Sequence, residues 1–170
     1  MENDSMRMFL SKENITKHKD HLKKMKSKLS LINKCYSDYK DMDSYTKKEV
    51  EYLNKYILSH ELFFNSFKTK SGVCKKIKGY FTSKERLLYD ISEMVKKYSF
   101  GFLFIYADKK KIPRISYSFD LREPFSLYDP ILAIDLFEHV YFADYGFNKD
   151  DFVKNALKYL DLDALESKLS

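Results

Sequence analysis

Two helical stripes in the first half of the chain constrain its fold more than any other feature. In both, the residues of one face recur at alternating steps of three and four positions: Ile15, His18, Leu22, Met25, Leu29 and Ile32, then Val50, Leu53, Ile57, His60, Phe64 and Phe67. This spacing predicts two amphipathic helices. The second is expected to begin after Thr46, with Glu49 as its capping-box partner. The polar stretch 33–45 between them predicts a loop that joins the helices into an antiparallel hairpin.

A histidine occupies one position in each stripe. His18 lies near the start of the first helix and His60 near the end of the second, and in an antiparallel hairpin these two ends are neighbours. At about 1.5 Å per residue, the segments from His18 to Asn33 and from Thr46 to His60 are both roughly 21–22 Å long. The two imidazoles are therefore expected at a similar height in the seam. A first helix that continued to Lys40 would separate them by roughly 10 Å.

The second half of the chain changes from a helical to a strand pattern. A third helix is expected over residues 82–98. The aromatic run 100–107 and the alternating stretch 112–119 enclose a polar turn and predict a β-hairpin, and residues 131–134 predict a third strand. Helical segments are expected to close the chain, one of them over residues 149–160.

These elements predict an α+β fold, in which an N-terminal antiparallel α-hairpin precedes an α/β domain with a three-stranded antiparallel sheet. We interpret the lysine-rich segment 68–79 as the connector, which gives a helical domain over residues 1–70 and an α/β domain over 71–170. No apolar run approaches the roughly 18–20 residues of a membrane-spanning helix, and the N-terminus lacks the apolar core of a secretory signal. Cys35 and Cys74 form no disulfide framework. A cytoplasmic location is expected, with a mitochondrial one as the alternative.

Four residues are candidates for a metal site between the two domains. Asp135 and His139 form a D-x-x-x-H pair directly after the third predicted strand. Together with His18 and His60 they offer three imidazole nitrogens and one carboxylate oxygen, a set that suits iron or manganese, with zinc as a rival. A lone histidine in an apolar stripe is more often a core residue, so the prediction depends on all four residues meeting. His21 lies off the stripe and is expected at the surface.

Three segments resemble one protein family. Residues 135–145 read D-L-F-E-H-V-Y-F-A-D-Y, which closely resembles the signature D-x-W-E-H-x-Y-Y-x-D-Y of the iron/manganese superoxide dismutases. Residues 60–67 are similar to the family's N-H-x-F-Y-W-N-x-L, and residues 98–105 to its F-G-S-G-W-x-W-L strand. The resemblance extends over roughly residues 10–162, in the family's order.

The resemblance implies a function. It implies one iron or manganese ion per chain, held by the four candidate ligands, which disproportionates superoxide to dioxygen and hydrogen peroxide. It also implies a homodimer, in which Glu138 reaches the partner's metal-bound histidine. The chain has a net charge of +6, concentrated in its first half, and this charge is expected to attract the superoxide anion.

The residues expected around the metal differ from the family pattern. The family's glutamine beside the metal solvent corresponds to Tyr56 or falls near Pro113, and its gateway tyrosine corresponds to Lys26. Its outer histidine and that residue's tyrosine partner correspond to Leu22 and Phe142. We hypothesise that the Tyr56 phenol replaces the glutamine as a donor; the alternative is a half-buried tyrosine that touches nothing catalytic.

Two further functions remain as alternatives. One is a structural superoxide-dismutase-like protein without catalysis, such as a subunit of a mitochondrial ribosome, which the basic first half and the altered surroundings of the metal favour. The other is an RNA-binding helical module, which the absence of a known binding motif opposes. A nucleic-acid partner is expected only under these alternatives, and a membrane partner under none.

Overall fold

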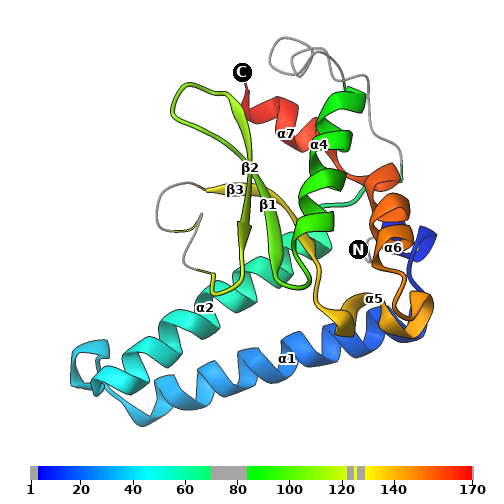
Figure 1. Cartoon of the computed structure of the whole chain (residues 1–170). Coiled ribbons are helices and arrows are strands. Elements are labelled where there is room, and N and C mark those ends of the chain that lie inside the picture. The colour runs from blue at the N-terminus through cyan, green and yellow to red at the C-terminus, as the bar shows by residue number, and fades with distance from the viewer. Residues whose placement is uncertain (1–3, 70–83, 122–124, 126–128, 170) are drawn as a thin grey trace.

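The computed structural model describes residues 4–69, 84–121, 125 and 129–169, and it confirms the predicted α+β fold (Figure 1). Helices α1 (Lys12–Cys35) and α2 (Ser44–Asn65) form a long antiparallel hairpin beside a three-stranded sheet. The strands are β1 (Phe102–Ala107), β2 (Pro113–Ser118) and β3 (Pro130–Asp135). The remaining helices are α4 (Lys84–Lys97), α5 (Glu138–Tyr145), α6 (Lys149–Ala156) and α7 (Leu162–Lys168), with short 3-10 helices at Asp4–Met8, Tyr39–Asp41 and Leu157–Tyr159.

The helical hairpin begins and ends close to the predicted positions, with one correction. Helix α1 ends at Cys35, so the expectation of an end near Asn33 is confirmed. Helix α2 begins at Ser44 rather than after Thr46. The reason is that the Asp43 carboxylate caps the helix: its Oδ1 accepts the backbone N–H groups of Tyr45 and Thr46 at 2.8 and 3.0 Å. The predicted capping box at Thr46 is therefore wrong.

The sheet has the order β2-β1-β3, and both strand pairs are antiparallel, which confirms the predicted β-hairpin and third strand. Phe102 at the start of β1 pairs with Asp135 on one side and with Ser118 on the other. Ala107, at the opposite end of β1, pairs with Pro113. This register fixes which residues of the sheet lie beside the candidate site.

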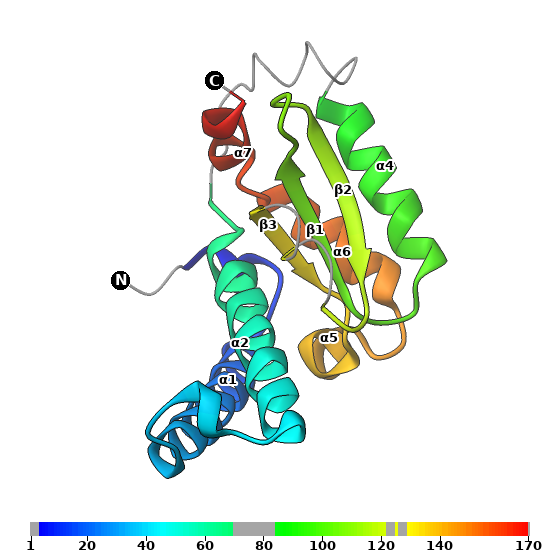
Figure 2. The same ribbon diagram turned by 90° about the vertical axis from the view of Figure 1, so that its left-hand side faces the viewer.

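The hydrophobic core joins the hairpin, the sheet and the C-terminal helices. Residues Phe102–Ile105 of β1 are fully buried, as are most residues of β3. Helix α4 lies on one side of the sheet, whereas α2 and α7 lie on the other (Figure 2). Because α2 packs on β3 and α1 packs on α5, the hairpin is held against the end of the sheet where Asp135 lies.

Two predictions concern segments at the edge of the described residues. The expected start of the third helix at residue 82, and the domain boundary near residue 70, lie outside them.

After Asn148, helix α6 and a 3-10 turn continue to Tyr159, so the predicted segment 149–160 is confirmed. Among the described residues, no helix is long and apolar enough to cross a membrane.

Candidate metal centre

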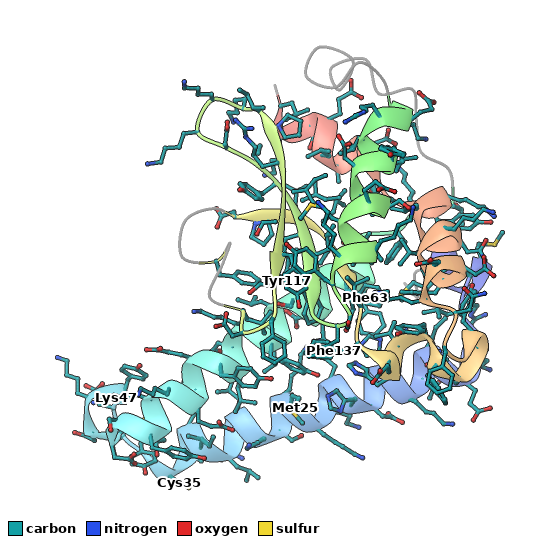
Figure 3. All side chains as sticks on the ribbon, in the orientation of Figure 1. Met25, Cys35, Lys47, Phe63, Tyr117 and Phe137 are labelled. Atoms are coloured by element: carbon teal, nitrogen blue, oxygen red, sulfur yellow. The ribbon has the colours of Figure 1, made fainter. Side chains whose placement is uncertain are left out.

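The structure brings the four predicted side chains together, each from a different element. The Nε2 atoms of His18 on α1, His60 on α2 and His139 on α5 lie 3.5, 3.4 and 3.6 Å from Oδ2 of Asp135, the last residue of β3. One ligand atom from each of the four residues lies within 4.8 Å of all the others. Phe63 and Phe137 adjoin the cluster where the hairpin meets the sheet (Figure 3): the Phe63 ring lies 5.3 Å from that of His18, and the Phe137 ring 5.8 Å from that of His139.

The three distances from Asp135 to the histidines fit the spacing of ligands around a metal ion. Two ligand atoms about 2.1 Å from a common ion and 110–120° apart would be separated by about 3.4–3.6 Å, which is the range of the three distances to Asp135. Both ring nitrogens of His18, Nε2 of His60 and Oδ2 of Asp135 are buried without a hydrogen-bond partner among the described residues. Such isolation of a buried carboxylate is costly. A cation at the centre would account for every one of these atoms except Nδ1 of His18.

Burial also sets the protonation states of the three histidines. It lowers the pKa of His18 to about 3, with help from nearby His21, and that of His60 to about 4. Burial lowers the pKa of His139 as well. All three imidazoles are therefore neutral at pH 7, the form that coordinates a metal. For Asp135, burial raises the pKa, and the neighbouring His60 and His139 act against that shift.

Local hydrogen bonds aim two of the candidate ligands. Oδ1 of Asp135 accepts the backbone N–H of Phe137 at 2.9 Å, which turns Oδ2 toward the histidines. Nδ1 of His60 lies 2.8 Å from the Tyr56 carbonyl oxygen. Because a carbonyl oxygen only accepts, Nδ1 carries the proton and Nε2 presents its lone pair to the cluster. A hydrogen bond from the ring nitrogen that does not face the metal is the usual way in which a protein fixes the tautomer of a histidine ligand.

Two longer-range hydrogen bonds hold the ligand-bearing elements in place. The buried amide of Asn14, one turn before His18, donates to the Val140 carbonyl oxygen at 2.6 Å and to Asp144 Oδ2 at 3.0 Å, so it joins α1 to α5. The Ser66 hydroxyl accepts the backbone N–H of Ala133 at 2.7 Å and joins the end of α2 to β3. The positions of the four candidate ligands therefore depend on contacts between residues far apart in the sequence.

The prediction that His21 lies at the surface is wrong. His21 is half-buried, and its Nε2 lies 3.0 Å from the Tyr56 hydroxyl oxygen. Tyr56 is itself buried, with its ring centroid 4.1 Å from that of His60, so it is not the isolated tyrosine of the alternative hypothesis. Burial and the nearby Asp135 raise the pKa of Tyr56, which keeps its hydroxyl protonated. The spacing of these residues in the sequence could have indicated the pair. His21 follows His18 by three residues and Tyr56 precedes His60 by four, so each shares a helix face with a candidate ligand.

The sheet register corrects another prediction. Pro113 pairs with Ala107, five residues along β1 from Phe102, and is thus roughly 17 Å from the strand end at Asp135. It does not lie near the cluster. At the end of β2 that lies nearest Asp135 the residue is Ser118, which is buried and pairs with Phe102.

The other residues singled out from the sequence lie at or near the surface, except Leu22, which is buried. Glu138 is exposed beside His139, whose side chain is 36% exposed. Lys26 forms an ion pair with Glu61 at 2.5 Å, and Phe142 is 48% exposed. The reach of Glu138 to a partner subunit stays a prediction.

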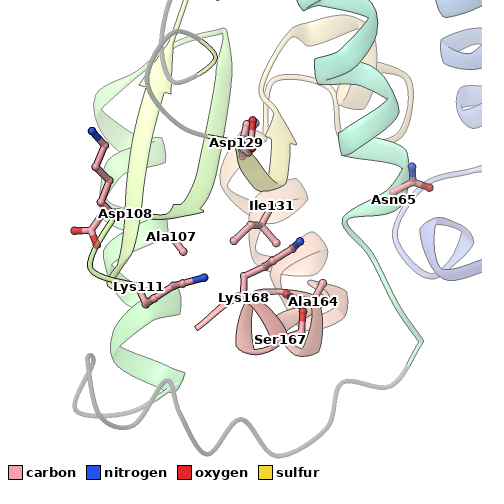
Figure 4. A pocket seen from close by; sticks show the side chains of 11 residues that line it. Asn65, Ala107, Asp108, Lys111, Asp129, Ile131, Ala164, Ser167 and Lys168 are labelled. Carbon is pink, nitrogen blue, oxygen red and sulfur yellow. Dashed lines mark hydrogen bonds between the residues drawn. The ribbon is translucent and has the colours of Figure 1, made fainter. Parts of the chain in front are cut away.

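A separate hollow of about 640 Å³ lies at the far end of the sheet (Figure 4). It is lined by Lys111 of the β1–β2 turn, Asp129 before β3 and Lys168 of α7, among others. Since it adjoins Ala107 and Pro130 rather than Phe102 and Asp135, it is not part of the histidine cluster.

Comparison with known families agrees with this geometry. Residues 69–168 match the family model of the C-terminal domain of iron/manganese superoxide dismutases. The match covers more than half of the 170 residues, so the chain belongs to the iron/manganese superoxide dismutase family. It includes Asp135 and His139, whereas the hairpin that carries His18 and His60 precedes it. No curated protein gave a significant match.

Proposed function

We propose that this protein is a superoxide dismutase whose single iron or manganese ion is held by His18, His60, Asp135 and His139. The observation that carries the proposal is the cluster itself, which is buried except at His139: three neutral imidazoles face one carboxylate oxygen that has no other partner among the described residues. The donor set suits a redox metal of this kind and leaves a position for solvent. Membership of the family supplies the substrate class.

When bound, the ion would alternate between its trivalent and divalent states, so that one superoxide is oxidised to dioxygen and a second, with two protons, is reduced to hydrogen peroxide. The chain's residues create the conditions for this chemistry. His18, His60 and Asp135 are 0–2% exposed, which excludes bulk water from the inner side of the centre. Tyr56 keeps a phenolic proton beside His60. The net charge of +6 would attract the anion, and the rate should therefore fall as ionic strength rises.

We further propose that the active form is a cytoplasmic homodimer. The exposed position of Glu138, next to the partly exposed His139, supports an arrangement in which Glu138 contacts a second copy of the chain. Measurement of the molecular mass in solution tests this part of the proposal.

The proposal is tested by metal analysis and a superoxide-dismutation assay on one purified sample. We expect about one iron or manganese ion per chain, as four ligands around one position imply, together with activity. The substitution Asp135→Asn should lower the metal content by more than roughly tenfold, because it removes the anionic ligand. Asp129→Asn is the matched control, since Asp129 is an exposed carboxylate just before the same strand.

The structural alternative predicts the opposite pattern. A chain that only supports an assembly would carry no iron or manganese, and Asp135→Asn would then leave its stability unchanged or raise it, because the substitution removes a buried ionisable group. That result would refute the enzymatic proposal.

A further inference from the structure

His21 and Tyr56 form a hydrogen-bonded pair against the histidine cluster. Nε2 of His21 lies 3.0 Å from the Tyr56 hydroxyl oxygen, and the Tyr56 ring packs on His60 with 4.1 Å between ring centroids. The His21 ring lies 5.3 Å from that of His139 and 6.1 Å from that of His60.

The pair lies on the side of the cluster that solvent reaches. The side chains of His18, His60 and Asp135 are 0–1% exposed, whereas that of His139 is 36% exposed. His21 is half-buried and adjoins His139. A small anion that enters the centre past His139 therefore comes close to His21 and the Tyr56 hydroxyl.

We propose that His21 is a positioning residue for the reaction: its Nε2–H donates to the Tyr56 hydroxyl oxygen and holds the phenolic O–H toward the anion or water in the centre. In this tautomer the hydroxyl oxygen accepts from His21, so its own proton is available to a third group. The opposite tautomer would direct the phenolic proton to His21 instead. The inference rests on the proposed metal site and gives that site a donor in place of the family's glutamine.

The hydrogen bond is tested first in the metal-free protein. Nitrogen NMR of histidine-labelled protein distinguishes the two tautomers of His21. We expect the neutral ring of His21 to carry its proton on Nε2 and not on Nδ1, with the Nε2 resonance shifted by Tyr56→Phe. A His21 protonated at Nδ1 would overturn the proposal.

The role in the centre is tested by the affinity of the metal-loaded protein for azide, a small monovalent anion, measured by optical titration. His21→Leu and Tyr56→Phe should each weaken azide binding roughly 2- to 10-fold, the effect of one lost hydrogen bond. The double variant should be no weaker than Tyr56→Phe alone, because His21 acts through the hydroxyl. His21→Gln keeps an N–H donor and should restore most of the affinity.

Tyr52→Phe is the matched control, since Tyr52 lies one turn before Tyr56 and is 45% exposed. It should leave azide binding unchanged. If His21→Leu loads metal normally and binds azide like the unmodified protein, or if the two losses add in the double variant, the inference fails while the metal site stands. An unmodified protein that binds no metal refutes the proposed function and this inference together.

Discussion

The amide of Asn14 offers a quantitative test of how the structure assembles the candidate metal site. Asn14 is 2% exposed, and its Nδ2 donates to the Val140 carbonyl oxygen at 2.6 Å and to the Asp144 carboxylate at 3.0 Å. Asn14→Leu keeps the number of non-hydrogen side-chain atoms but removes both hydrogen bonds. A neutral hydrogen bond contributes about 1 kcal/mol and one to a charged group somewhat more, so the free energy of unfolding should fall by about 2–3 kcal/mol.

The assay is urea unfolding of the metal-free protein. The midpoint should fall without a change in the slope m, and the melting temperature should fall by roughly 4–12 °C for a domain of this size. Asn54→Leu, a substitution of an exposed amide on α2, is the control and should have little effect. Because Asn14 lies one turn before His18 and Val140 follows His139, a chelator should also remove metal faster from the Asn14→Leu variant.

The partner carboxylate gives this prediction a pH dependence. Burial raises the pKa of Asp144, but hydrogen bonds from Ser11 and Asn14 outweigh burial, and the net pKa lies below its usual range. The unfolded chain therefore takes up the proton at a higher pH than the folded chain. The stability that Asp144 contributes is complete above about pH 3.9 and is lost as the pH falls through the lower folded value.

A double-mutant cycle with Asp144→Ala isolates the contact, since residues in direct contact give non-additive effects. The reasoning would be refuted if Asn14→Leu lowered the free energy of unfolding by less than about 0.5 kcal/mol, the scale of ordinary surface substitutions. Strict additivity in the cycle would refute it as well.

Two further substitutions test the frame of the site. Ser66→Ala removes the acceptor of the buried Ala133 N–H and should cost about 1–3 kcal/mol by urea unfolding. Ser59→Ala is the control, because among the described residues its hydroxyl bonds only to the Lys55 carbonyl on its own helix. Equal losses would contradict the α2–β3 link. Gly101→Ala should cost at least roughly 1–3 kcal/mol, the scale of backbone strain, because Gly101 has φ +122° and an added Cβ would also lie 2.9 Å from the Ser118 carbonyl oxygen. Thermal unfolding measures that loss. Gly146→Ala also places alanine at a positive φ, +56°, but its added Cβ meets nothing within 4 Å among the described residues, so it should cost less.

The hairpin shows how far local patterns lead. The alternating steps of three and four placed His18 and His60 on facing stripes, and helix length alone predicted their similar height; their ring centroids are 5.0 Å apart. The sequence does not fix the start of α2, because Asp43, Ser44 and Thr46 all favour a helix N-terminus. The cap is the residue whose side chain reaches the free amides of the first turn, and in the structure that residue is Asp43.

The sequence by itself determined the helical hairpin, the three strands and the four candidate ligands, because each depends on a periodicity or motif within a short segment. Tertiary structure alone decided the His21–Tyr56 pair, the Asn14 and Ser66 links and the distance of Pro113 from the cluster. The partners of Asn14 and Ser66 lie 126–130 and 67 positions away in the chain. No local pattern specifies such partners, since they meet only when helix packing and strand register bring distant backbone segments together.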